Sequence, residues 1–163
     1  METSPQNKLI LACGNPLRGD DGVGWTIAES LRQDPVFADV KIVVTHQFGP
    51  ELTELLRHAD VVAFVDASAS AAPGEVSSLG VEAASEVPHA FSHHLPPAGL
   101  MALTDYLYGR VPELAFAVSV GGESFDLSPG FQESAMGASL TPPVRAAIPE
   151  AIALLREVFA HAQ

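Results

Sequence analysis

Two kinds of apolar pattern alternate along the chain. Continuous apolar runs of five to seven residues predict buried strands, and apolar residues spaced three or four apart predict amphipathic helices. The predicted strands are Lys8–Cys13, Val40–Thr45, Val61–Val65, a weaker Glu75–Val81, and Leu114–Val120. The predicted helices are Val23–Leu31, Pro50–His58, one that opens at Leu95-Pro96-Pro97 and ends near Tyr108, and Pro142–Ala162.

Alternation of apolar strands with helices is typical of an α/β fold, in which helices cover both faces of a mainly parallel sheet. The chain has no internal repeat and no linker-like segment, so we expect a single domain over residues 1–163, with residues 1–7 as a flexible tail. In open α/β sheets, active sites form outside the carboxyl ends of the strands. Polar residues that follow the predicted strands are therefore the first candidates for function.

A glycine-rich acidic loop, GNPLRGDDGVG (14–24), follows the first predicted strand. Its spacing imitates a phosphate-binding loop, but Asp20 and Asp21 occupy the places where such a loop has Lys and Ser or Thr. Two carboxylates repel a phosphate, whereas carboxylate oxygens are common ligands of metal cations. We expect Asp20 to cap the following helix. For Asp21, the sequence leaves a cation site and a structural role at the helix N-terminus equally open.

Three further polar features fall at the same predicted edge of the sheet. Asp66 directly follows the third strand, and the adjacent pair His93 and His94 precedes the helix that opens with two prolines. Carboxylates and histidine are common ligands of zinc and nickel, so these loops predict a cation site. The spacing does not decide which histidine points toward the acids. Glu123, after the last strand, belongs either to this site, to a partner contact or to a plain surface loop.

Composition narrows the classes of partner. The chain of 163 residues has 20 acidic residues against 8 Lys and Arg, a formal net charge of −12. An acidic surface repels nucleic acids and anionic membranes, so we expect neither as a partner. The single cysteine, Cys13, allows no internal disulfide. The sequence shows no signal peptide and no apolar run of membrane-spanning length, and we expect a cytoplasmic monomer.

Five segments carry more specific motifs. They are GNPLRGDDGVG (14–24), HQFGPEL (46–52), VDAS (65–68), SHHLPPAGL (92–100) and VGGESF (120–125). In this order they resemble the signatures of the nickel–iron hydrogenase maturation proteases, and the resemblance extends over nearly the whole chain. It implies a three-layer α/β sandwich with a twisted five-stranded sheet between helices.

The resemblance also implies an activity. Members of this family are endopeptidases, grouped with the aspartic type, that remove a C-terminal extension from the large-subunit precursor of a nickel–iron hydrogenase once nickel has been inserted, and so activate it. Carried over position by position, the metal-binding and catalytic residues are Asp21, Asp66 and His94, while His93 occupies a variable place. The nickel is then carried by the substrate and is not a permanent cofactor.

Two positions depart from the usual family pattern. Ala12 stands where Gly is common, and Asp21 stands where Glu is common, which keeps the charge but shortens the reach of the carboxylate. The main alternative is a non-enzymatic module that checks or delivers nickel during hydrogenase assembly. Such a module would hold metal without substrate and would cleave nothing. A nucleotide- or flavin-binding domain is disfavoured by the two adjacent acids.

Overall fold

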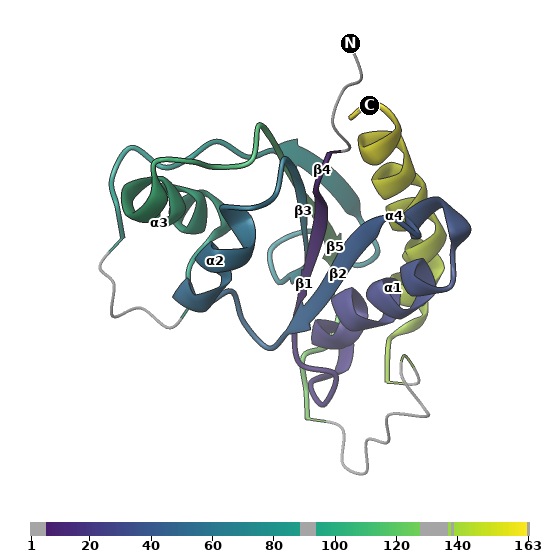
Figure 1. Ribbon diagram of the computed structural model, residues 1–163. Coiled ribbons are helices and arrows are strands. Elements are labelled where there is room, and N and C mark those ends of the chain that lie inside the picture. The colour runs from purple at the N-terminus through teal and green to yellow at the C-terminus, as the bar shows by residue number, and fades with distance from the viewer. Residues whose placement is uncertain (1–5, 89–93, 128–136, 138, 163) are drawn as a thin grey trace.

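The computed structural model describes residues 6–88, 94–127, 137 and 139–162 (Figure 1). Within these residues, five strands form one twisted sheet in the order β2-β1-β3-β5-β4. The strands are β1 (Lys8–Cys13), β2 (Val40–Thr45), β3 (Val61–Ser68), β4 (Val76–Gly80) and β5 (Leu114–Gly121). All pairings are parallel except that of β4, which runs antiparallel to β5 at one edge. The predicted mainly parallel five-stranded sheet is confirmed.

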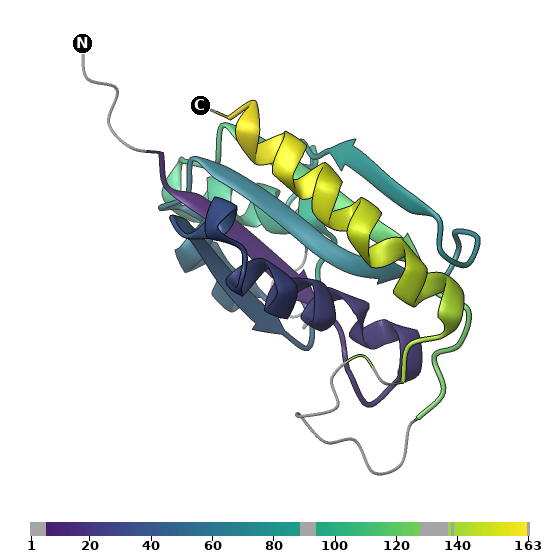
Figure 2. The ribbon, with the colours of Figure 1, turned by 90° about the vertical axis from the view of Figure 1, so that its right-hand side faces the viewer.

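Helices cover both faces of this sheet (Figures 1 and 2). On one face lie α1 (Val23–Arg32) and α4 (Pro142–Ala160), and on the other lie α2 (Thr53–Leu56) and α3 (Pro97–Tyr108). The described residues also form three short 3-10 helices: η1 (Gly19–Gly22), η2 (Pro35–Phe37) and η3 (Pro50–Leu52). None of the helices in the described ranges is both long and apolar enough to cross a membrane. The placement of helices on both faces of the sheet confirms the predicted three-layer arrangement.

Alternate residues of the strands feed two separate cores. In β1, Ile10 and Ala12 pack toward α1 and α4, whereas Leu9, Leu11 and Cys13 pack toward α2 and α3. Successive side chains of a strand point to opposite faces, so a strand covered on both faces must be apolar throughout. This burial on both faces explains the continuous apolar runs in the sequence. Whether a residue is odd or even in the strand decides which pair of helices its side chain contacts.

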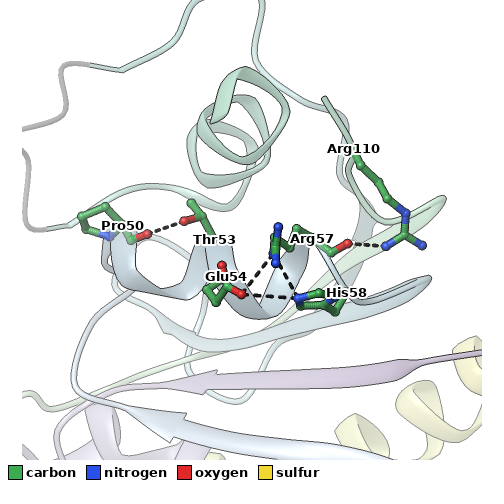
Figure 3. Close-up of polar contacts among 6 residues, drawn as sticks. All are labelled: Pro50, Thr53, Glu54, Arg57, His58 and Arg110. Atoms are coloured by element: carbon green, nitrogen blue, oxygen red, sulfur yellow. Dashed lines mark hydrogen bonds and ion pairs between the residues drawn. The ribbon is translucent and has the colours of Figure 1, made fainter. Parts of the chain in front are cut away.

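Two predicted boundaries are wrong. Strand β3 does not end at Val65, because it keeps pairing with β5 through Asp66 and as far as Ser68. The predicted helix Pro50–His58 is instead η3 followed by the single turn of α2. After α2, the backbone N–H of His58 donates to the Leu55 carbonyl oxygen at 3.2 Å, a bond of the 3-10 type. The Arg110 guanidinium donates to the Arg57 carbonyl oxygen at the helix end (Figure 3). The helix therefore ends at Leu56, and the chain enters β3 at Val61.

The first turn of helix α1 lies close to the sheet at Gly24. A Cβ atom added to Gly24 would lie 2.6 Å from the carbonyl oxygen of Cys13 and 3.2 Å from that of Val65. Both are backbone atoms of central strands, which cannot move aside as a flexible side chain can. Gly24 therefore permits the close approach that sets the acidic loop against the carboxyl ends of β1 and β3.

This contact gives the first prediction. Gly24→Ala should destabilise the protein by about 1–3 kcal/mol through overpacking, although alanine is the better helix former by about 1 kcal/mol. Urea unfolding measures the change. The control Glu29→Ala, at an exposed position of the same helix, should stay within about 0.5 kcal/mol of the wild type. A Gly24→Ala variant that is more stable than the wild type would show that the close approach is not a constraint.

Candidate active site

The acidic loop is folded back so that Asp21 lies at the carboxyl end of β1. Gly14 has a φ of 142°, and a Cβ atom there would meet the Asp21 carbonyl oxygen at 1.9 Å, so only glycine fits. The backbone N–H of Asn15 donates to Asp21 Oδ2 at 2.9 Å. The backbone of its own loop thus holds the Asp21 carboxylate, and this side chain is only partly buried.

Asp20, the preceding residue, is completely buried and joins three segments of the chain. Its Oδ2 accepts hydrogen bonds from the backbone N–H groups of Glu123 (2.8 Å) and Ser124 (3.0 Å) and from the Thr141 hydroxyl (2.8 Å). Its Oδ1 accepts from the backbone N–H of Thr141 at 2.7 Å. Burial alone would raise the pKa of Asp20, but these bonds outweigh it, and the pKa lies below its ordinary value.

The expectation that Asp20 caps the following helix is therefore wrong. Gly22 is the N-cap residue of α1, and no side chain caps it. Asp20 instead binds Thr141, which is the N-cap residue of α4. A buried carboxylate needs several donors, and the loop after β5 and the start of α4 supply them. The local sequence around Asp20 contains no sign of these partners.

Asp66 lies on β3 and points to the same face as α2 and α3. Val62 and Phe64 pack into the core on that face, and Asp66 continues their alternation. Burial raises the pKa of Asp66 to about 7; the hydrogen bond from the Ala67 backbone N–H (2.8 Å) opposes this rise, and the negative charge of Asp21 adds to it. Asp66 therefore changes its protonation state near neutral pH.

The ionisation of Cys13 is affected by the same two carboxylates, Asp66 and Asp21. Burial and, to a smaller extent, the charges of Asp66 and Asp21 together raise the pKa of its thiol to about 12. A thiol with such a pKa is not ionised at neutral pH and is a poor nucleophile. Cys13 is buried in the core on the α2 and α3 side of the sheet, so it acts as a packing residue. The effect of both charges on its thiol shows that Asp21 and Asp66 lie close enough to act on one neighbour.

A row of polar side chains crosses the sheet at this end, and the sequence did not single it out. Asp66 lies opposite Ser119 of β5, and Ser119 lies opposite Ser77 of β4. The two serine hydroxyls form a hydrogen bond of 2.7 Å. The only sequence signal for Ser119 is one hydroxyl within the otherwise apolar run LAFAVSV, and it gains meaning only when the strands are aligned.

The third predicted residue, His94, lies in the segment that leads into α3, and its side chain is exposed. The backbone N–H of Leu95 donates to the carbonyl oxygen of Phe48 at 2.8 Å, which attaches this segment to the loop after β2. Among the described residues, no group of three or more His, Cys, Asp or Glu side chains is arranged to hold a metal ion. Asp21 and Asp66 thus lie near each other, but the structure does not assemble them with His94 into a closed site.

Two other expectations concern residues near this edge. His93 lies outside the described residues. Glu123 is exposed, and its backbone N–H rather than its side chain makes the bond to Asp20. Assignment of the site to Asp21, Asp66 and His94 stays a prediction.

Comparison with known proteins decides the family. No family model and no curated protein matches the chain. Among solved structures, the hydrogenase maturating endopeptidase HybD from E. coli is 30% identical, with 91% of this chain and 89% of that chain covered and a TM-score of 0.67. This chain belongs to the hydrogenase maturation endopeptidases. It is therefore a peptidase with a role in hydrogenase maturation, and the family resemblance of its motifs is confirmed.

Two further solved structures share the fold of this endopeptidase. An endopeptidase from E. coli is 25% identical over 95% of this chain and 93% of that chain, with a TM-score of 0.70. The NiFe hydrogenase maturation protease HybD from Thermococcus kodakarensis is 20% identical over 93% of this chain and 97% of that chain, with a TM-score of 0.63. The second likeness, at its low identity, supports the fold alone.

The buried carboxylate of Asp20 gives a prediction for the stability of this endopeptidase. Asp20→Asn should lower the free energy of unfolding by roughly 2–3 kcal/mol, because the amide replaces one acceptor oxygen by a donor that faces other donors. Urea unfolding at pH 7 measures the loss. Glu123→Gln, at an exposed residue of the neighbouring loop, is the matched control and should leave the unfolding midpoint unchanged. Equal midpoints for Asp20→Asn and wild type would contradict the joining role of Asp20.

The raised pKa of Asp66 predicts that its contribution to stability decreases with rising pH, which is opposite to the usual effect of a carboxylate whose pKa is lowered by folding. In the unfolded chain the carboxyl group ionises near pH 3.8, whereas in the folded protein it ionises near pH 7. Between these values the folded state binds more protons, so the Asp66 contribution to stability falls as the pH rises from about 4 to 7. Asp66→Asn, which mimics the neutral acid, should therefore melt above the wild type at pH 8.

The melting temperatures of Asp66→Asn and wild type should converge as the pH approaches 4. Differential scanning calorimetry of both proteins across this range measures the difference, and effects of the other acids cancel in the comparison. A constant difference between pH 4 and 8 would show that the Asp66 pKa is not raised.

Proposed function

We propose that this endopeptidase removes a C-terminal extension from the large-subunit precursor of a nickel–iron hydrogenase, and that it recognises the nickel carried by that precursor. The observation that supports the proposal is the proximity of Asp21 and Asp66 at the carboxyl end of the central strands. The pKa of Asp66 is raised by burial and by the Asp21 charge, so the pair favours the arrival of a cation that would relieve the repulsion.

The roles follow from the chemistry of these groups. Asp21 and Asp66 supply carboxylate oxygens, and His94 supplies an imidazole from the segment before α3, which are donor types suited to nickel. The nickel of the substrate then polarises the scissile carbonyl group or activates a water molecule. One of the two carboxylates acts as general base, and a pKa of Asp66 of about 7 suits proton transfer near neutral pH. Because the proposed general base is an aspartate, we group the enzyme with the aspartic-type endopeptidases.

The substrate carries the metal, so cleavage depends on prior nickel insertion. An exposed His94 and a partly buried Asp21 leave the site open toward a protein partner. A net charge of −12 favours a partner that presents a cation. The expectations of a cytoplasmic monomer without nucleic-acid or membrane partners remain predictions. A non-enzymatic nickel module is disfavoured, because the relative at 30% identity is named an endopeptidase.

The site assignment is tested by processing of a nickel-loaded large-subunit precursor in vitro. Asp21→Ala, Asp66→Ala and His94→Ala should each lower kcat/KM by roughly 100-fold or more, because each removes a metal ligand or the general base. The control Asp126→Asn removes an exposed acid at the same end of the molecule and should process the precursor at the wild-type rate.

Two outcomes of the processing assay would contradict separate parts of the proposal. Wild-type cleavage by both Asp66→Ala and His94→Ala would overturn the assignment of the site. Equally fast cleavage of nickel-free precursor by the wild-type enzyme would overturn recognition of the metal but leave the peptidase activity intact. Mass spectrometry of the released peptide distinguishes cleavage at the C-terminal extension from unspecific proteolysis.

A further inference from the structure

The serine pair beside Asp66 lies on the face of the sheet that carries the proposed catalytic carboxylate. Ser119 continues the alternation of Ala115 and Ala117, which pack toward α2 and α3, and Ser77 is paired with it in register. Strand β5 lies between β4 and β3, and Ser119 is in register with Ser77 on β4 and with Asp66 on β3. The three side chains therefore form one row across β3, β5 and β4. Neighbouring strands lie about 4.8 Å apart, so the row extends the site by two strands toward the sheet edge.

This part of the sheet face is open. Leu79, two residues beyond Ser77 and therefore on the same face, is 68% exposed. Ser77, Ala117 and Ser119 are each only partly buried. Within the described residues β4 pairs with β5 alone, so its outer backbone edge has no strand partner there. We call this surface, made of Ser77, Leu79, Ala117 and Ser119, the β4–β5 shelf.

The hydroxyl pair of the shelf retains hydrogen-bonding capacity. Its internal bond of 2.7 Å uses one O–H donor and one acceptor lone pair. The second O–H and the remaining lone pairs are left to bind another group. A polypeptide main chain offers both a carbonyl acceptor and an N–H donor at every residue except proline, and the exposed Leu79 adds an apolar contact for a side chain. The shelf thus matches an extended peptide and has no charged group of its own that would select an ion.

We infer that the β4–β5 shelf is a substrate subsite, in which Ser119 and Ser77 hydrogen-bond the main chain of the precursor beside the scissile bond. The inference rests on the proposed function, because continuity of the row with Asp66 identifies the occupant as the polypeptide that is cut. The subsite binds peptide and not nickel. Loss of the hydroxyls therefore raises KM and leaves kcat largely unchanged, unlike loss of Asp66.

The test uses two measurements on the full-length enzyme. The first is KM and kcat for processing of the nickel-loaded precursor, and the second is the Kd for the nickel-free precursor, which the proposed reaction leaves uncut. Ser119→Ala and the double variant Ser77→Ala/Ser119→Ala should raise both KM and Kd by roughly threefold to tenfold. Ser119→Thr keeps a hydroxyl in a side chain suited to a strand and should restore both values.

Ser78→Ala is the matched control. Ser78 lies on the same strand but on the opposite face, where it lines a groove with α4, so its removal should change neither value. The inference is overturned when the Ser119→Ala and double variants keep wild-type KM and Kd, or when Ser78→Ala weakens binding equally. A wild-type enzyme that leaves the nickel-loaded precursor uncut refutes the proposed function instead. In that case the Kd values alone decide whether the shelf binds peptide.

Discussion

The geometry of the loops at the carboxyl ends of the strands depends on one buried carboxylate. Asp20 is removed from solvent without a basic partner among its hydrogen bonds, and four donors from two distant segments compensate for that burial. These bonds hold the loop after β1 against the loop after β5 and against the start of α4. Because Asp21 is the next residue, the clamp on Asp20 also determines where the Asp21 carboxylate lies. The first of two adjacent acids in one motif thus fixes the position of the second.

Asp66 and Asp21 form a second pair of acids, in which burial and the neighbouring charge disfavour the ionised form of Asp66. Asp66 projects from a central strand into a half-buried position beside Asp21, and burial together with this charge moves its pKa to about 7. Cys13 is held un-ionised by the same surroundings. Groups with perturbed ionisation gather at functional sites, where stability is lost in exchange for chemistry. In this endopeptidase, the two groups with raised pKa values, Cys13 and Asp66, lie at the carboxyl ends of β1 and β3, while the two apolar cores on either side of the sheet stabilise the fold.

The antiparallel edge strand continues the row of polar side chains from Asp66 beyond the central strands. In a parallel sheet, every strand brings its carboxyl end to the same edge. Strand β4 runs the other way, so its first residues rather than its last lie there, and Ser77 meets Ser119 beside Asp66.

The sequence by itself determined the order of the elements, the α/β class and the edge at which the candidate residues lie, because these follow from local apolar periodicity and from the rule that sites form at strand ends. It placed Asp21 and Asp66 at that edge, and the family motifs, not the spacing, selected His94 over His93. Only the tertiary structure decided the rest. The partners of Asp20 lie more than 100 residues away in the chain. The alignment of Asp66 with Ser119 and Ser77 is a matter of register between strands. Hydrogen-bond partners and register depend on which distant segments meet, and no local pattern of apolar and polar residues records that.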